Sequence, residues 1–209
     1  TVIIYGFTKK DGNFEHSVFL TFDSGKSWKN ITSPKFGRIE GGCFAGESGK
    51  LYILSAHYVF TSSDWGNSWQ QSADALMKNY SADITLLTDP DNENILYAGG
   101  KGEIYRSLDA GDHWTLHTKG LNKDLFNRDI IIDRSDHSTL FYTCSDGIYK
   151  STDRGESWQA SNAGLLFARV NAIEISPSSP ETMFISWRNN AVYKTTDALT
   201  KSAAAEPFI

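Results

Sequence analysis

The stretch STDRGESW at residues 151–158 decides the fold of this chain, because the same eight-residue pattern occurs four times. The other copies are residues 21–28, 62–69 and 107–114, and each has Ser or Thr first, Asp third, Gly fifth and Trp eighth. A fifth copy begins at Thr195 and then fails, because Leu199 stands where the glycine belongs. The chain is therefore a tandem repeat.

The spacing of the pattern indicates the architecture. Successive aspartates at 23, 64, 109, 153 and 197 are separated by 41, 45, 44 and 44 residues. Periods of about 40–50 residues, with several short strand-like runs in each, are typical of β-propellers. A single small sheet cannot bury its own faces, so neighbouring sheets have to stack.

The octad has a physical explanation as a turn between two strands. A short Asp side chain accepts hydrogen bonds from backbone N–H groups of its own turn, and the Ser or Thr hydroxyl supplies a second local partner. Glycine suits a position with positive φ, and the Trp ring is expected to be buried against the neighbouring sheet. An Asp committed to its own turn is a poor candidate for catalysis. These structural residues are Asp23, Gly25, Trp28, Asp64, Gly66, Trp69, Asp109, Gly111, Trp114, Asp153, Gly155 and Trp158.

Aligning the chain on the octad predicts an all-β fold of about five four-stranded antiparallel repeats. The fourth repeat is the clearest, with expected strands at 129–133, 139–144, 148–151 and 158–160. The expected repeats are residues 1–33, 34–78, 79–122, 123–165 and 166–200, followed by a tail at 201–209 that does not continue the pattern.

Both ends of the repeat array are incomplete. The first repeat lacks its first strand, and the fifth lacks its Trp and its last strand. Three explanations remain open: a five-bladed ring with ragged closure, a piece of a larger propeller, or a ring completed by another chain. An unpaired outer edge in these incomplete end repeats also favours self-association.

Composition excludes several classes of function. The net charge is -5 with both signs mixed, so no broad basic surface for nucleic acid is expected, and no apolar run is long enough to span a bilayer. Cys43 and Cys144 lie in apolar strand-like stretches about two repeats apart, and we expect two buried free thiols. No Cys or His spacing suits a metal, so neither a metal nor a cofactor is expected.

The four octads resemble the Asp box of the BNR-repeat proteins, and the resemblance covers nearly the whole chain. This class includes sialidases, xyloglucan-cleaving glycosidases, sortilin-type receptor ectodomains and the photosystem II stability/assembly factor. The resemblance implies a β-propeller in which the box lies on the face opposite the ligand site. It is specific for the fold and says little about function. We expect a secreted, periplasmic or other extracytoplasmic location.

A second pattern, Phe-x-Arg, occurs at or just before the first strand of three repeats. In a propeller this strand lines the central channel, so three guanidinium groups would meet at the channel mouth, where the planar Arg fork suits carboxylate or phosphate ligands. Alternatively, each Arg pairs with a nearby acid such as Asp129 or Glu40 and each Phe is ordinary packing. The residues are Phe36, Arg38, Phe126, Arg128, Phe167 and Arg169.

We predict a non-catalytic binding or scaffold module. Its ligand, held at the channel-mouth face, would be a protein, a carbohydrate or an anionic ligand such as an acidic peptide. The alternative is a glycoside hydrolase resembling sialidases or xyloglucanases, or a fragment of one. Such an enzyme needs two carboxylates across the scissile bond, and no spacing singles out a pair. The acids that could lie near the same face are Asp11, Asp83, Asp129 and Asp146.

Overall fold

The computed structural model describes residues 2–10, 13–45, 48–76, 84–100, 102–122, 127–162, 165, 170–187, 192–196 and 206–207. The chain divides into two compact units, each considered by itself. The first comprises Thr1–Ala82, Leu86–Leu96 and Ser107–Trp114, and the second comprises Asp83–Thr85, Tyr97–Arg106 and Thr115–Ile209. The third sheet contributes residues to both.

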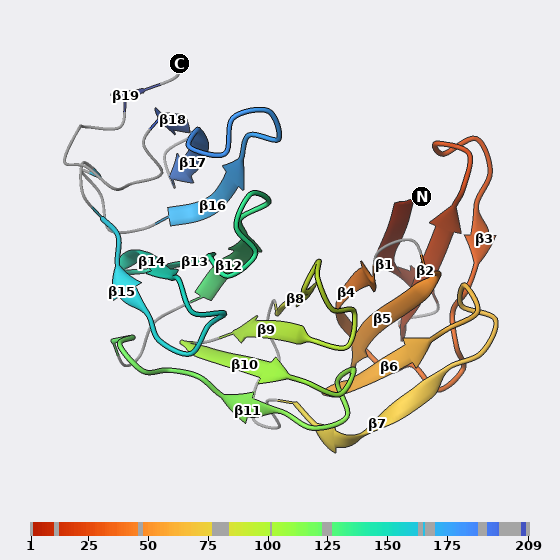
Figure 1. The fold of residues 1–209 in the computed structure, drawn as a ribbon. Coiled ribbons are helices and arrows are strands. Elements are labelled where there is room, and N and C mark those ends of the chain that lie inside the picture. The colour runs from red at the N-terminus through yellow and green to blue at the C-terminus, as the bar shows by residue number, and fades with distance from the viewer. Residues whose placement is uncertain are drawn as a thin grey trace. The chain divides into compact units, whose positions relative to one another are not determined.

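The described residues form five antiparallel sheets whose strands follow one another in chain order (Figure 1). The first sheet contains β1 (Val2–Lys10), β2 (Asn13–Thr21) and β3 (Lys29–Asn30). The second contains β4 (Ile39–Ala45), β5 (Lys50–Ser55), β6 (Tyr58–Ser62) and β7 (Gln70–Ala75). The third contains β8 (Thr85–Thr88), β9 (Leu96–Gly100), β10 (Glu103–Ser107) and β11 (Thr115–Leu116).

The fourth and fifth sheets repeat this arrangement. The fourth contains β12 (Asn127–Ile132), β13 (Leu140–Cys144), β14 (Gly147–Ser151) and β15 (Gln159–Ala160). The fifth contains β16 (Val170–Ile175), β17 (Met183–Trp187), β18 (Val192–Thr195) and β19 (Glu206–Pro207). The prediction of an all-β chain of antiparallel sheets is confirmed. Within the described part of the chain, no helix is long and apolar enough to cross a membrane.

The last strand of the fifth sheet differs from the sequence analysis. Tyr193 and Lys194 of β18 pair with Pro207 and Glu206 of β19. These two residues lie in the stretch 201–209, which was expected to stand outside the repeat, and they supply the fourth strand that the fifth repeat was expected to lack. Backbone pairing does not require the Trp and Gly of the octad, so a short unrelated segment can take this place.

Burial differs between the strands of one sheet and explains their sequences. Both β9 and β13 are buried at every residue, whereas β15 is exposed at both. β9 and β13 are each the second strand of their sheet, with a paired strand on both edges and both faces covered. Their sequences are therefore short, mainly apolar runs. An outermost strand has one free edge and can be short and polar.

Apolar packing between successive sheets holds each unit together. In the first unit, the first and second sheets share a buried cluster of Val18, Leu20, Ile31, Ile39, Leu51, Ile53 and Phe60. In the second unit, the fourth and fifth sheets share Phe141, Ile148, Val170, Ile173, Ile175, Met183 and Ile185. Each fully buried side chain of this size contributes about 1.5–3 kcal/mol. Stacking of the sheets therefore supplies the core that no single sheet could form.

Both cysteines are free thiols. Burial raises the pKa of Cys43, and it raises the pKa of Cys144 to about 11. A thiol with a raised pKa forms little thiolate at neutral pH and is a weak nucleophile. Cys144 is buried, as the sequence predicted, whereas Cys43 is half-buried.

Candidate functional site

The four octads form the same hydrogen-bonded turn, called the Asp turn below. In the first, Asp23 Oδ1 accepts hydrogen bonds from the Thr21 hydroxyl at 2.7 Å and from the Ser27 N–H at 2.9 Å. The Thr21 Oγ1 in turn accepts the Gly25 N–H at 3.0 Å. All these bonds link residues at most four positions apart, so the eight residues alone specify the turn.

The hydrogen bonds of the turn stabilise the ionised form of the four aspartates. Chiefly the side-chain hydrogen bond from Ser27 lowers the pKa of Asp23 to about 2, and Ser68 does the same for Asp64. Burial pushes the pKa of Asp109 and of Asp153 upward, but the hydrogen bonds outweigh it and both pKa values are lowered. Carboxylates held in this way are structural acceptors and are not available as general acids.

The glycine of each turn has a positive φ, between 76° and 89°. In three turns it also lies against the preceding sheet of the same unit. A Cβ at Gly66 would lie 2.7 Å from Ile31, one at Gly111 would lie 3.0 Å from Val59, and one at Gly155 would lie 3.6 Å from Tyr97. At Gly25, the one described residue that a Cβ would meet is Trp28 of its own turn, at 3.7 Å.

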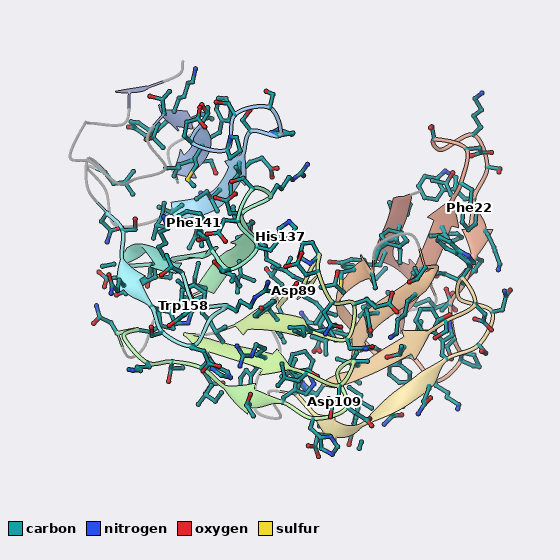
Figure 2. All side chains as sticks on the ribbon, in the orientation of Figure 1. Phe22, Asp89, Asp109, His137, Phe141 and Trp158 are labelled. Atoms are coloured by element: carbon teal, nitrogen blue, oxygen red, sulfur yellow. The ribbon has the colours of Figure 1, made fainter. Side chains whose placement is uncertain are left out.

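The Trp rings are not equally buried, which corrects the prediction that each is covered by a neighbouring sheet. Trp158 is 2% exposed, and its backbone N–H donates to the Lys119 carbonyl at 2.9 Å. Trp28 is 41% exposed. The difference comes from the neighbouring residues. Lys119 and Gly120, which follow β11 of the third sheet, lie against Trp158. No described residue of a preceding sheet covers Trp28. The labelled Phe22 and Trp158 in Figure 2 mark these two turns.

A donor from the preceding sheet binds three of the turns at the carbonyl that follows the Asp. Lys29 Nζ donates to the Trp65 carbonyl at 3.4 Å, and Thr61 Oγ1 donates to the Ala110 carbonyl at 3.4 Å. In the second unit Arg106 Nη1 donates to the Arg154 carbonyl at 2.9 Å.

Sequence reasoning missed these donors, although the alignment contains a signal for them. The residue directly before the octad is a potential donor in four of the five repeats: Thr61, Arg106, Lys150 and Lys194. The first repeat has Leu20 there, and its cross-strand neighbour Lys29 takes over the role.

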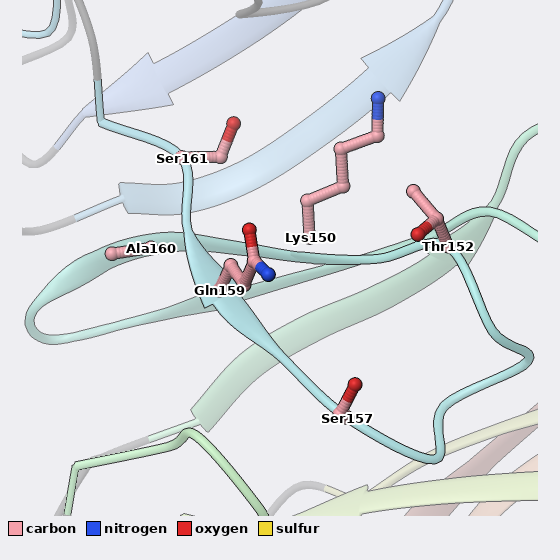
Figure 3. Close-up of a pocket in the computed structure, with 6 residues that line it drawn as sticks. All are labelled: Lys150, Thr152, Ser157, Gln159, Ala160 and Ser161. Atoms are coloured by element: carbon pink, nitrogen blue, oxygen red, sulfur yellow. The ribbon is translucent and has the colours of Figure 1, made fainter.

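A small polar cavity of about 120 Å³ lies beside the fourth sheet (Figure 3). Its lining residues are Lys150, Thr152, Ser157, Gln159, Ala160 and Ser161. Lys150 occupies the donor position of the fourth repeat, and its Nζ lies 5.4 Å from the ring centroid of Phe141. The fifth octad, which would follow this sheet in sequence, lies outside the described residues from Asp197 onward.

The opposite end of the second sheet carries the first Phe-x-Arg. The register pairs Ile39 with Ser55 and Ser55 with Tyr58 at this end, whereas the Asp turn follows Ser62 at the other end. Phe36 packs edge-on against Phe60 and Trp69, with ring centroids 5.0 and 5.1 Å away. Its ring therefore contributes to the packing of the sheet.

Arg38 is exposed, and it forms no side-chain hydrogen bond or ion pair with any residue that the structure describes. The nearest acid in sequence, Glu40, is already occupied. Its side chain is 2% exposed, Oε2 accepts the His57 N–H at 3.2 Å, and Oε1 lies 3.9 Å from His57 Nδ1. The guanidinium is thus available to a ligand.

The arginines of the three Phe-x-Arg patterns occupy two different positions relative to the first strand of their sheets. Register shifts at Ile39/Gly41, Asn127/Asp129 and Val170/Ala172 mark a β-bulge at the start of β4, β12 and β16. Arg38 and Arg169 directly precede β4 and β16, whereas Arg128 is the extra residue of the bulge inside β12. Bulges redirect side chains, so Arg128 is not equivalent to the other two. Phe126, Phe167 and Arg169 lie outside the described residues, as does the Arg128 side chain. A meeting of three guanidinium groups stays a prediction.

Two of the four candidate carboxylates, Asp129 and Asp146, lie in the described part of the chain. Asp11 and Asp83 lie outside it. Asp129 accepts the Ile130 N–H at 2.9 Å and the Thr85 hydroxyl at 3.4 Å, and burial raises its pKa. Asp146 is exposed and accepts the Tyr149 hydroxyl at 3.1 Å. No contact between Asp129 and Asp146 occurs among the described residues, nor does any cluster of acids, His and Cys suited to a metal.

Known proteins resemble this chain in structure but not in sequence. No protein-family model and no curated protein sequence matches the chain. Solved structures do. A GH74 xyloglucanase from Xanthomonas campestris is similar with a TM-score of 0.71 and 15% identity over 99% of this chain and 36% of that one. An ancestral GH74 enzyme is similar with a TM-score of 0.67 and 20% identity over 91% of this chain and 28% of that one.

A third similar structure is YCF48 bound to D1 peptide, with a TM-score of 0.60 and 17% identity over 86% of this chain and 57% of that one. The chain thus spans about a quarter to somewhat over half of these proteins. At such identities the likeness shows the fold alone, which is of the β-propeller type. The number of blades and the closure of a ring stay predictions.

Proposed function

We propose that this chain is a non-catalytic binding module of the β-propeller type, with an anionic ligand held at the sheet ends that carry Arg38. An acidic peptide is the ligand class that we favour. The observation that carries the proposal is the free guanidinium of Arg38 beside an acid, Glu40, that is turned away to His57.

A contrast with Arg106 supports this assignment. Arg106 is bound to the Arg154 carbonyl and to the Glu156 carboxylate, and its side chain is 14% exposed. Arg106 therefore joins two sheets, whereas Arg38 keeps all its donors for a partner. An Arg fork binds a carboxylate through two parallel hydrogen bonds. Arg128 and Arg169 stay predicted ligand residues, on the basis of the repeated Phe-x-Arg pattern alone.

The similarity to YCF48, whose structure contains a bound peptide, favours a peptide over a small anion. We also propose an extracytoplasmic location and an array of blade-like repeats, as the octads imply. The ligand would then be reached at the end of the sheets away from the Asp turns, where loops vary without disturbing the repeated turn.

A labelled acidic peptide tests the proposal. Fluorescence anisotropy with an octaglutamate peptide should show binding that weakens as salt is added. Arg38→Ala should weaken binding roughly tenfold, because a hydrogen bond to a charged group contributes about 1.5–3 kcal/mol. Arg134→Ala is the matched control, since Arg134 is an exposed cation in the turn between β12 and β13. Equal losses in the two variants would contradict the proposal.

The alternative function is hydrolysis of a glycan, for which the likeness to two GH74 enzymes and the raised pKa of Asp129 are the supporting observations. It requires a second carboxylate about 5–10 Å from the first. Release of reducing sugar from xyloglucan that disappears in Asp129→Asn would support this function in place of the binding module.

A further inference from the structure

A second cavity lies within the first unit, between the last segment of the first sheet and the second Asp turn. Its volume is about 460 Å³, which is within the range of small-molecule sites. The first sheet supplies Lys29, Asn30 and Lys35 to its lining, and the turn supplies Asn67 and Trp69. This space is called the two-lysine cavity below.

A β-turn holds Lys35 at the two-lysine cavity. The Phe36 N–H donates to the Ser33 carbonyl at 3.0 Å, and Pro34 occupies the second position of the turn, where its fixed φ is favoured. The Ser33 Oγ accepts the Lys35 N–H at 3.2 Å, and Phe36 packs edge-on against Trp69. Lys35 is exposed, and its ammonium group forms no hydrogen bond or ion pair with a described residue. The turn is therefore fixed by its own contacts, while the Lys35 ammonium is available to a ligand.

Lys29 keeps an uncompensated charge because the side chain that it contacts is neutral. Its Nζ donates to Asn67 Oδ1 at 2.6 Å, and it forms no ion pair with a described residue. Asn67 is the sixth residue of its octad, and the third and fourth octads have acids, Asp112 and Glu156, at that position. In the fourth turn this acid neutralises the preceding sheet's cation, because Glu156 pairs with Arg106. In the second turn the same position leaves the cation without a counter-charge.

The rest of the lining does not supply that counter-charge. None of the described residues that line the two-lysine cavity is acidic. Asp64 of the same turn does not line it, and its Oδ1 and Oδ2 accept hydrogen bonds from the Ser68 N–H at 2.9 Å and the Ser68 hydroxyl at 2.7 Å. In a chain with a net charge of -5, two cations in a concave site without an acid in its lining indicate a site for an anion.

Trp69 gives the cavity an apolar side. In the fourth turn, the segment after β11 covers Trp158, which is 2% exposed. Trp69 is half-buried, and its Nε1 donates to the Ile31 carbonyl in the segment after β3 at 3.1 Å. The space beside Trp69 therefore stays open, and an apolar group of a ligand can be buried there.

We propose that the two-lysine cavity binds a small phosphate monoester, with the phosphate at the Lys29 and Lys35 ammonium groups and the organic part against Trp69. A phosphate monoester carries about −1.5 to −2 charges at pH 7, so it compensates both lysines, whereas a carboxylate compensates one. Lys binds phosphate as a point charge. The Asn30 Oδ1 accepts the Thr32 N–H at 2.9 Å, which leaves the Asn30 amide NH2 group as a further donor to the phosphate.

Isothermal titration calorimetry with phenyl phosphate tests the proposal. Phenyl phosphate should bind more tightly than benzoate, which has a single charge, and more tightly than inorganic phosphate, which has no apolar group. Lys35→Ala should raise the Kd roughly tenfold, because a charged hydrogen bond is lost. Lys119→Ala is the matched control, since Lys119 is an exposed lysine without a described side-chain partner in the segment after β11. Binding no tighter than that of benzoate or inorganic phosphate, or equal losses in the two variants, would overturn the proposal.

Asn67→Asp provides a second test that removes no contact. It places an acid where the third octad has Asp112, and the Lys29 contact becomes an ion pair. The turn should therefore be retained while the Kd for phenyl phosphate rises roughly tenfold. Gln71→Glu adds the same charge on the exposed strand β7 outside the cavity and should leave the Kd unchanged. Equal weakening by both changes would contradict a specific site.

The two-lysine cavity is separate from the proposed peptide site, because Arg38 does not line it. Arg38→Ala should therefore leave the affinity for phenyl phosphate unchanged, and a loss in this variant would overturn the assignment of the phosphate to the two lysines. The peptide-binding test of Arg38 is independent of either outcome.

Discussion

The first and the fourth Asp turns have the same internal structure in different surroundings. In each, the first hydroxyl donates to the Asp at 2.7 Å and the N–H four residues after the Asp donates to it at 2.9 Å. Yet Trp28 is exposed and Trp158 is buried. The octad therefore forms its turn by local hydrogen bonds, and the surrounding residues decide whether its Trp ring is buried.

The largest expected effect separates the two tryptophans. Trp158→Ala should lower the free energy of unfolding by about 3–5 kcal/mol, because it leaves a cavity in a closed site. Trp28→Ala should cost about 2 kcal/mol less, since roughly 80–100 Å² less apolar area of the ring is buried. Urea unfolding in dilute solution measures both. Equal losses would mean that the turn itself, and not its cover, holds the ring in place.

An intermediate effect separates the two arginines that lie at opposite ends of their sheets. Arg106→Met should lower the free energy of unfolding by about 2 kcal/mol, because the Arg154 carbonyl and Glu156 lose a charged donor. Arg38→Met should change it by less than about 0.5 kcal/mol, as expected for a surface residue without a partner. Thermal or urea unfolding of the two variants checks this, and a large loss in Arg38→Met would show that Arg38 is structural.

The smallest effect concerns the third turn, where His113 replaces the serine of the other turns. The hydrogen bond to Asp109, followed by the charge of that carboxylate, raises the pKa of His113. A raised pKa in the folded state means that His113 contributes stability below its unfolded pKa, about 6.5, and that this contribution is lost as the pH rises through the folded value. His113→Ser should therefore cost more stability at pH 5 than at pH 9, measured by urea unfolding at both.

The aspartates have the opposite pH dependence to His113: in all four turns their contribution to stability is lost in acid. The pKa values of Asp23 and Asp64 are lowered to about 2, so their stabilising contribution is present above the unfolded pKa, about 3.9, and is lost as the pH falls toward 2. In the wild-type chain the third turn is thus stabilised most between these two limits.

The sequence predicted most of the strands but less of the candidate site. Expected strands at 139–144 and 148–151 agree with β13 and β14 within one residue, because short apolar runs between turn residues are local signals. The sequence pattern did not distinguish Arg38 from Arg128, whereas the bulge in β12 places the Arg128 backbone inside the strand. A bulge depends on pairing with the next strand and leaves no mark in Phe-x-Arg itself.

By itself, the sequence determined the four Asp turns and the antiparallel order of each sheet, because these depend on hydrogen bonds between residues at most four apart and on short loops. The tertiary structure alone decided which Trp is buried, which glycine touches a neighbour, and that donors such as Thr61 and Arg106 bind a carbonyl 49 and 48 residues away. The physical reason is range: these contacts depend on the packing of one repeat against the next, and identical octads carry no information about what covers them.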